Sequence, residues 1–175
     1  MHTRRPLVIA LILASGALFA ACTQTIATAA AQQASTNKPI ASAAAALPEV
    51  HVYKDANCGC CSLWVNHLRD AGFKVKVTDT VDMGAVKHRV GVPYGKGSCH
   101  TAEVGGYFIE GHVPAQDIKR LLAQRPAAKG LVLPGMPLGS PGMEVPSGVV
   151  QPYTVELVGG NGTTRQWSRH GTAGK

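Results

Sequence analysis

Thiol side chains are the groups of this sequence best suited to chemistry, and three of them fall within four positions. Cys58 and Cys61 form a C-x-x-C pair, and Cys60 lies inside it. The cluster follows a strand-like run and opens a helix-like run, and a helix start favours the thiolate form. Neighbouring thiolates repel one another unless a cation neutralises them, and Cu(I) prefers thiolate and thioether ligands. The cluster therefore predicts a soft-metal site, with copper favoured over zinc.

Disulfide chemistry is the alternative use of the same thiols. Cys58 and Cys61 could close a C-x-x-C disulfide and exchange it with substrates, and Cys60 could pair with Cys99 in a longer one. A bond between the adjacent Cys60 and Cys61 is disfavoured, because consecutive Cα atoms lie only about 3.8 Å apart. Exchange needs two thiols, so the third thiol favours metal binding over exchange and over a purely structural framework.

Four residues outside the cluster are further candidate ligands. Cys99 is followed at once by His100, although a buried cysteine beside a surface histidine would give the same pattern. Met136 and Met143 stand in two Pro-Gly-Met units, where thioether sulfur suits Cu(I). Each methionine could instead be a flexible filler that packs the loop onto the core. His112 follows the end of an expected strand and could face the site.

The secondary structure expected around these residues is that of an α/β domain. Apolar spacing, caps and turns predict, in chain order, strand 49–54, a helix from the cysteines to Gly72, strand 73–77, helix 83–90, strands near 99–103 and 106–111, a helix opened by Pro114, a Pro/Gly/Met-rich loop over 130–148, and a C-terminal β-hairpin of 153–158 and 163–167. The order β-α-β-α-β-β-α predicts a thioredoxin-like fold. Its chemistry sits at the start of the first helix, where the cysteines lie.

The N-terminal segment has the features of an export signal. Two arginines precede the apolar run Leu7–Ala14, which is too short for a mature membrane helix. We therefore expect residues 1–22 to be a signal peptide. Leu18–Cys22 resembles a bacterial lipoprotein box, which would place a lipid on Cys22, while the small residues of Ala27–Ala31 offer a rival cleavage site.

Residues 23–47 are mainly Ala, Thr, Gln and Ser, with no aromatic residue and almost no charge. Such a composition cannot bury a core, so it predicts a flexible tether. A single metal-binding domain is expected over residues 48–170, a length that is sufficient for one modest core.

The charge pattern argues against nucleic-acid binding. Loss of the leader with its two arginines lowers the formal net charge from +7 to +5, and the remaining basic residues are scattered without interleaved aromatics. Motifs for nucleotide binding, acyl transfer and zinc proteolysis are missing from the sequence. Thiol chemistry is the only catalysis that the sequence supports, and a metal-binding protein is favoured over an enzyme.

Several unusual motifs together resemble one known family, the CopG-type copper-resistance family. The resemblance covers about Val50–Tyr153 and rests on Tyr53-Lys54, Cys58-Gly59-Cys60-Cys61, Trp64, His67-Leu68, Gly72-Phe73, Gly91-Val92-Pro93, Ser98-Cys99-His100-Thr101-Ala102, Gly106-Tyr107, Glu110-Gly111-His112-Val113-Pro114, Pro134-Gly135-Met136-Pro137 and Gly139-Ser140-Pro141-Gly142-Met143. It implies a thioredoxin-like fold and export to the periplasm. It also implies that copper is handled by the thiolates of Cys58, Cys60, Cys61 and Cys99, with Met136 and Met143 in the family's methionine loop.

The expected function is therefore periplasmic copper binding that supports copper resistance. The metal would be Cu(I), held in a thiolate-bridged cluster, with cycling between Cu(I) and Cu(II) as an extension. Expected partners are copper ions and other periplasmic copper-handling proteins, with membrane contact only through a lipid on Cys22. The alternative is a thiol–disulfide oxidoreductase that uses Cys58 and Cys61.

Overall fold

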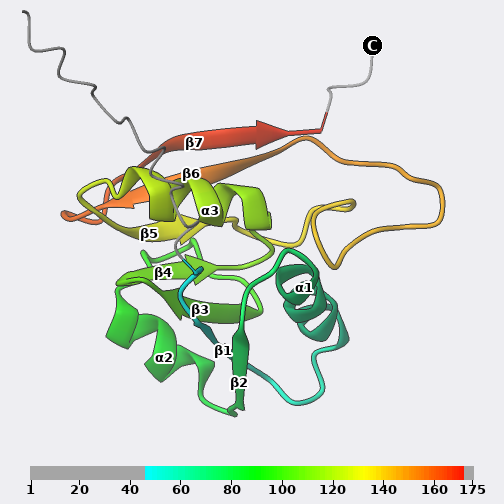
Figure 1. The fold of residues 1–175 in the computed structure, drawn as a ribbon, viewed down its shortest axis with the longest axis horizontal. Helices are drawn as coiled ribbons and strands as arrows, with labels where there is room; N and C mark the ends of the chain where they lie inside the picture. Colours follow the sequence, from blue (N-terminus) through cyan, green and yellow to red (C-terminus); the bar gives the residue numbers. More distant parts are fainter. Residues whose placement is uncertain (1–45, 172–175) are drawn as a thin grey trace, which may run out of the picture. The chain divides into compact units, whose positions relative to one another are not determined.

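The computed structural model describes residues 46–171, which form three helices and seven strands (Figure 1). The elements are β1 (Val50–Lys54), α1 (Gly59–Asp70), β2 (Val75–Asp79), α2 (Met83–Val90), β3 (His100–Val104), β4 (Tyr107–Glu110), α3 (Ala115–Gln124), β5 (Ala128–Val132), β6 (Tyr153–Gly159) and β7 (Thr164–His170). The first seven follow the expected β-α-β-α-β-β-α order, and the C-terminal hairpin is confirmed. The expected signal peptide 1–22, with Cys22, and most of the tether 23–47 lie outside the described residues.

All seven strands join one sheet in the order β2-β1-β3-β4-β5-β6-β7. The pairs β1/β2 and β4/β5 are parallel, and the other neighbours are antiparallel. Strand β5 corrects the sequence prediction, which placed residues 130–132 in a loop. Gly130 is the reason for the error, because glycine usually signals a loop. Here it lies within a strand, where a Cβ would collide with the Phe108 carbonyl of β4.

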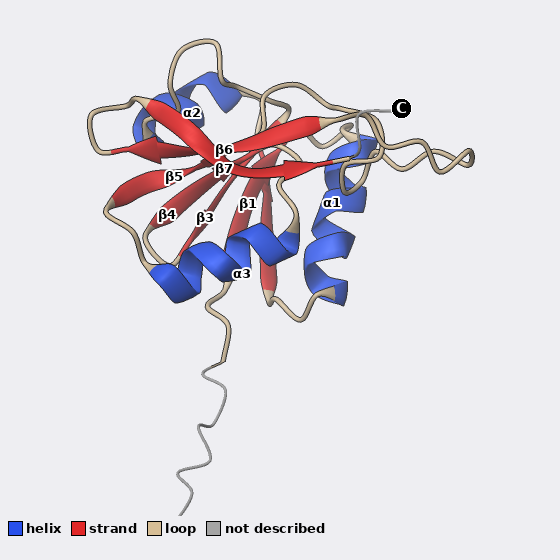
Figure 2. Ribbon diagram, turned by 90° about the horizontal axis from the view of Figure 1, so that it is seen from above, coloured by secondary structure: helices blue, strands red, loops and turns tan. Residues whose placement is uncertain are grey.

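Helices cover both faces of the sheet, with α1 and α3 on one side and α2 on the other (Figure 2). The main core lies under α1 and α3, and its largest contributions from α1 are Trp64, Val65 and Leu68. Their three-and-four spacing puts them on one helix face. The α2 side holds a smaller apolar cluster around Phe108, and no residue of α2 itself is fully buried.

The long segment 133–152 between β5 and β6 contains the two Pro-Gly-Met units and is without helix or strand, as predicted from residue 133 onward (Figure 1). It packs against the start of α1 at Gly142, whose φ is +83°. A Cβ at this position would lie 2.8 Å from the carbonyl oxygen of Cys60 and from the backbone nitrogen of Trp64. Among the helices within residues 46–171, none is long and apolar enough to cross a membrane.

Candidate metal centre

Three cysteines occupy the start of α1, as the sequence predicts. Cys58 is the N-cap, and its Sγ accepts a hydrogen bond from the Cys61 backbone N–H at 3.3 Å. Cys58 and Cys61 are joined by a disulfide, whereas Cys60 is a free thiol with its Sγ 3.6 Å from the Sγ of Cys58. We call this segment, Cys58–Cys61, the helix side of the site.

The opposite side of the site is formed by Cys99, His100 and His112, which we call the strand side. Cys99 directly precedes β3, and the antiparallel pairing of β3 with β4 brings His112 beside it. The four sulfur atoms of Cys58, Cys60, Cys61 and Cys99 lie within 4.8 Å of one another, and so do the ligand atoms of the strand side. Cys99 belongs to both groups and therefore connects them.

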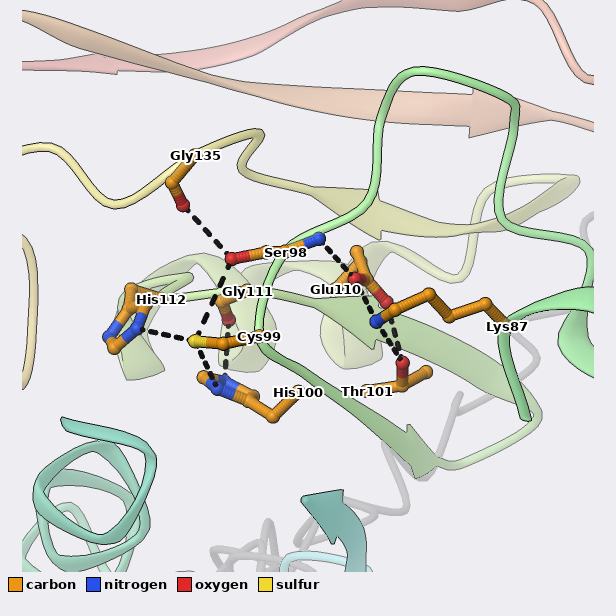
Figure 3. Close-up of polar contacts among 9 residues, drawn as sticks. All are labelled: Lys87, Ser98, Cys99, His100, Thr101, Glu110, Gly111, His112 and Gly135. Carbon is orange, nitrogen blue, oxygen red and sulfur yellow. Dashed lines mark hydrogen bonds and ion pairs between the residues drawn. The ribbon is translucent and has the colours of Figure 1, made fainter. Parts of the chain in front are cut away.

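The environment of Cys99 keeps its sulfur protonated at neutral pH. Burial and then the charge of Cys60 raise the pKa of the Cys99 thiol to about 11. A metal ion favours the thiolate and would displace this proton on binding. The thiol can meanwhile donate to His112 Nε2, which lies 3.3 Å from its sulfur (Figure 3).

Backbone carbonyls fix the tautomers of both histidines. His112 Nδ1 lies 2.8 Å from the Pro141 carbonyl oxygen, and His100 Nε2 lies 3.0 Å from that of Gly111. A carbonyl only accepts hydrogen bonds, so each of these nitrogens carries the proton. The lone pairs of His112 Nε2 and His100 Nδ1 are then left facing Cys99 Sγ, at 3.3 and 3.6 Å. This arrangement is typical of histidines that bind metals.

Burial also keeps both imidazoles neutral. It lowers the pKa of His112, and together with the nearby His112 it lowers the pKa of His100 to about 3. His100 lies under the Trp64 ring, with ring centroids 4.3 Å apart, and the Trp64 indole N–H donates to the Val113 carbonyl at 2.9 Å. The core of α1 thus packs directly against the strand side.

The chain is similar to known proteins in sequence and in fold. The family model described as "Protein of unknown function, DUF411" matches residues 96–143, which include the strand side and both methionine units. No curated protein matches the chain. A solved structure described as "Copper resistance protein copG- Form 1" is 44% identical with a TM-score of 0.68, and the match covers 72% of this chain and 99% of that one. This chain belongs to the CopG copper-resistance family. A second structure, "Copper resistance protein copG- Form 2", is 45% identical over 71% of this chain and 98% of that one, also with a TM-score of 0.68.

The two candidate methionines of this CopG-family protein lie in the segment that borders the site. Met136 is half exposed, and it follows Gly135, whose carbonyl accepts a hydrogen bond from the Ser98 hydroxyl at 2.9 Å. Met143 is partly buried and follows Gly142, which packs on Cys60. Each methionine therefore follows a glycine that lies near a candidate thiolate. Gly135 contacts Ser98, which is next to Cys99, and Gly142 contacts Cys60.

His100 and His67 each have a defined hydrogen-bond partner in the structure. The sequence associates His100 with Cys99 but leaves its burial open, and the structure shows it completely buried with a lone pair toward Cys99. The ring that covers His100 belongs to Trp64, and the sequence shows Trp64 only as an apolar residue one turn into α1. His67 is also hydrogen-bonded, because its Nε2 accepts from the Ala115 N–H at 3.0 Å at the start of α3.

Proposed function

We propose that this protein binds copper in the periplasm and contributes to copper resistance. The observation that carries the proposal is the convergence of four cysteine sulfurs and two neutral imidazole lone pairs at one end of the sheet. Thiolate-rich sets with imidazole suit copper better than magnesium or calcium, which prefer oxygen ligands. The names of the two related structures point to the same metal.

We assign the ligands to Cys58, Cys60, Cys61, Cys99 and His112, and Met136 and Met143 complete the set from the bordering segment. Thiolate and thioether sulfur select Cu(I), and four sulfurs this close can bridge several copper ions. His100 joins this set, because its Nδ1 lone pair faces Cys99. Zinc is a weaker fit, because structural zinc sites take four ligands and this site offers more.

The Cys58–Cys61 disulfide gives the site two forms. With the disulfide closed, only Cys60 and Cys99 among the described cysteines are free thiols. Reduction by two electrons and two protons returns two more thiols, so the reduced form offers the full set of four. Two Cu(I) ions that are oxidised to Cu(II) would release the two electrons that this reduction takes up, and on this balance we base the proposed cycling of copper between the two states.

The fold and location complete the proposal. We take the domain to be thioredoxin-like, supported by the order β-α-β-α-β-β-α, the parallel pair β1/β2 and the site at the start of α1, with β5, β6 and β7 added at one edge. Export through the leader 1–22 would place it in the periplasm beside other copper-handling proteins, and a lipid on Cys22 would tether it to a membrane.

Anaerobic titration of the reduced protein with Cu(I), against a competing chelator, tests the proposal. Wild-type protein should bind Cu(I) tightly, and Cys60→Ser should bind it at least about tenfold more weakly, since it removes a ligand rather than a supporting residue. Ser62→Ala is the matched control on the same helical turn, with an exposed side chain. Weak binding by the wild type, unchanged in Cys60→Ser, would refute the copper site.

A thiol–disulfide oxidoreductase is the alternative, and the Cys58–Cys61 disulfide is the observation in its favour. The free thiols of Cys60 and Cys99 beside that disulfide favour metal binding instead. An insulin-reduction assay on metal-free protein separates the two. Rapid turnover that is lost in Cys61→Ser, together with weak copper binding, would support the enzyme.

A further inference from the structure

A buried carboxylate lies directly behind the strand side and is not among the ligands proposed above. Glu110 ends β4 and has no exposed surface. Its Oε1 accepts from the Ser98 backbone N–H and from Lys87 Nζ, both at 2.5 Å, and its Oε2 accepts from the Thr101 hydroxyl at 2.7 Å (Figure 3). A charge is rarely buried unless such partners satisfy it.

Glu110 reaches these partners on the face of the sheet that α2 covers. Side chains alternate along a strand, so Glu110 lies on the same face as Phe108, which belongs to the apolar cluster on the α2 side. Lys87 comes from α2 and also donates to the Thr101 hydroxyl at 3.0 Å. The ion pair therefore anchors α2 to the sheet from the side opposite α1.

The residues bound by Glu110 flank the Cys99-His100 dipeptide. Ser98 precedes it and Thr101 follows it, so one carboxylate holds the chain on both sides of two candidate ligands. The Ser98 hydroxyl in turn donates to the Gly135 carbonyl, next to Met136. We infer that Glu110, held by Lys87, is a positioning residue of the copper site that fixes the place of Cys99 from the far face of the sheet.

The hydrogen bonds around Glu110 suit a carboxylate. Lys87 donates to the Thr101 oxygen, so the Thr101 hydroxyl is free to donate to Glu110. Both oxygens of Glu110 then accept only, which a carboxylate can do. Glutamine at this position would direct its NH2 group either at two donors, Ser98 N–H and Lys87, or at the Thr101 hydroxyl, and in both cases it would remove the negative charge that Lys87 pairs with.

The first test measures the reactivity of the two free thiols in metal-free protein with the Cys58–Cys61 disulfide intact. The probe is iodoacetamide, and peptide mass spectrometry gives the alkylation rates of Cys60 and Cys99 separately. Glu110→Gln should raise the Cys99 rate about tenfold, which corresponds to the loss of one hydrogen bond to a charged group. The Cys60 rate should stay unchanged. A merely structural role would raise both rates together.

Glu156→Gln is the matched control. Glu156 pairs with Lys96 at 2.7 Å and so ties the same connection before β3 to a different strand, away from the site. In Glu156→Gln, the thiols of Cys60 and Cys99 should react with iodoacetamide at the rates of the wild type. Lys87→Met should reproduce the Glu110→Gln pattern, and the double variant should be no more reactive at Cys99 than the stronger single variant. If Glu110→Gln does not fold, Thr101→Val removes one flanking bond and should raise the Cys99 rate alone.

The second test is Cu(I) competition with the reduced variants, which rests on the proposed function. Glu110→Gln should weaken Cu(I) binding about tenfold to a hundredfold, the range known for residues that support metal ligands. Unchanged Cys99 reactivity in Glu110→Gln and Thr101→Val, or equal acceleration at Cys60, would overturn the positioning role. Absence of Cu(I) binding by the wild type would instead refute the copper function and leave the alkylation result to stand by itself.

Discussion

The helix side, Cys58–Cys61, supplies three sulfurs from within four positions at the start of one helix. The strand side, Cys99 with His100 and His112, is assembled by the pairing of β3 with β4. Two sulfurs of the helix side are joined in a disulfide, whereas both histidines of the strand side are buried and hydrogen-bonded to backbone carbonyls. The first side can change the number of thiols it offers, and the second presents fixed lone pairs.

This difference suggests a division of roles within one site. Redox chemistry changes the number of thiols on the helix side, whereas backbone carbonyls orient the histidines of the strand side. The strand side depends instead on tertiary structure, because its ligands are held by β3, β4 and the segment that contains Pro141. Substitutions should therefore affect the two sides in distinguishable ways.

The largest effect is expected where the two sides touch. Trp64→Ala removes the buried ring that covers His100, and it should lower the free energy of unfolding by about 3–5 kcal/mol. Urea denaturation of the metal-free protein measures this loss. Leu63→Ala, at a neighbouring position with 57% of the residue exposed, should change it by less than about 0.5 kcal/mol. Similar losses in both variants would contradict the packing of α1 against the strand side.

The next effect concerns the strand side alone. His112→Gln removes the lone pair that faces Cys99. Cu(I) affinity should fall at least about tenfold, because loss of a residue that only supports a metal ligand already costs that much. Chelator competition measures it, and His88→Gln, on the exposed surface of α2, serves as the control. An unchanged affinity in His112→Gln would remove His112 from the ligand set.

Reduction of the disulfide tests the helix side alone. The bond closes a loop of only a few residues, so its reduction should cost no more than about 2 kcal/mol of stability on the chain-entropy estimate. Denaturation of metal-free protein with and without a reductant measures this change. The variant with Cys58→Ser and Cys61→Ser should not respond to the reductant. A much larger loss on reduction would mean that the helix side holds the fold together.

The smallest effect is expected from pH. Burial lowers the pKa of His67, and likewise those of His100 and His112, so the unfolded chain binds protons more readily than the folded one. The contribution of these histidines to the free energy of unfolding is therefore fully present above their ordinary pKa of about 6.5, and it is lost as the pH drops below that value. His67→Gln keeps an acceptor for the Ala115 N–H. On going from neutral pH to pH 6, the free energy of unfolding of this variant should fall less than that of the wild type, by a difference of less than about 1 kcal/mol. An identical pH profile would show that His67 does not contribute.

The helix side is more predictable from sequence than the strand side. The crowding of Cys58, Cys60 and Cys61 before an apolar helical pattern is a local signal, and it locates the cluster at the start of α1. The closeness of Cys99 depends on the pairing of β1 with β3, and the tautomer of His112 depends on the Pro141 carbonyl from a segment far along the chain. Backbone carbonyls leave no mark in a residue pattern.

Two other features could not be read from the sequence for definite physical reasons. Strand β5 contains Gly130, which is required by the nearby Phe108 backbone and not by a turn. The cysteine pattern allowed more than one disulfide, and the structure shows the bond between Cys58 and Cys61. The Glu110 contacts across β3 and β4 likewise appear only when the sheet is formed.

The closure of Cys58 with Cys61 within a single helical turn also bears on how the chain matures. Short loops close with little loss of chain entropy. Cys58 and Cys61 are three positions apart, whereas the rest of α1, β2 and α2 separate them from Cys99. Pairing of Cys58 with Cys61 therefore needs no tertiary structure, and it is favoured over any pairing with Cys99 before the sheet has formed.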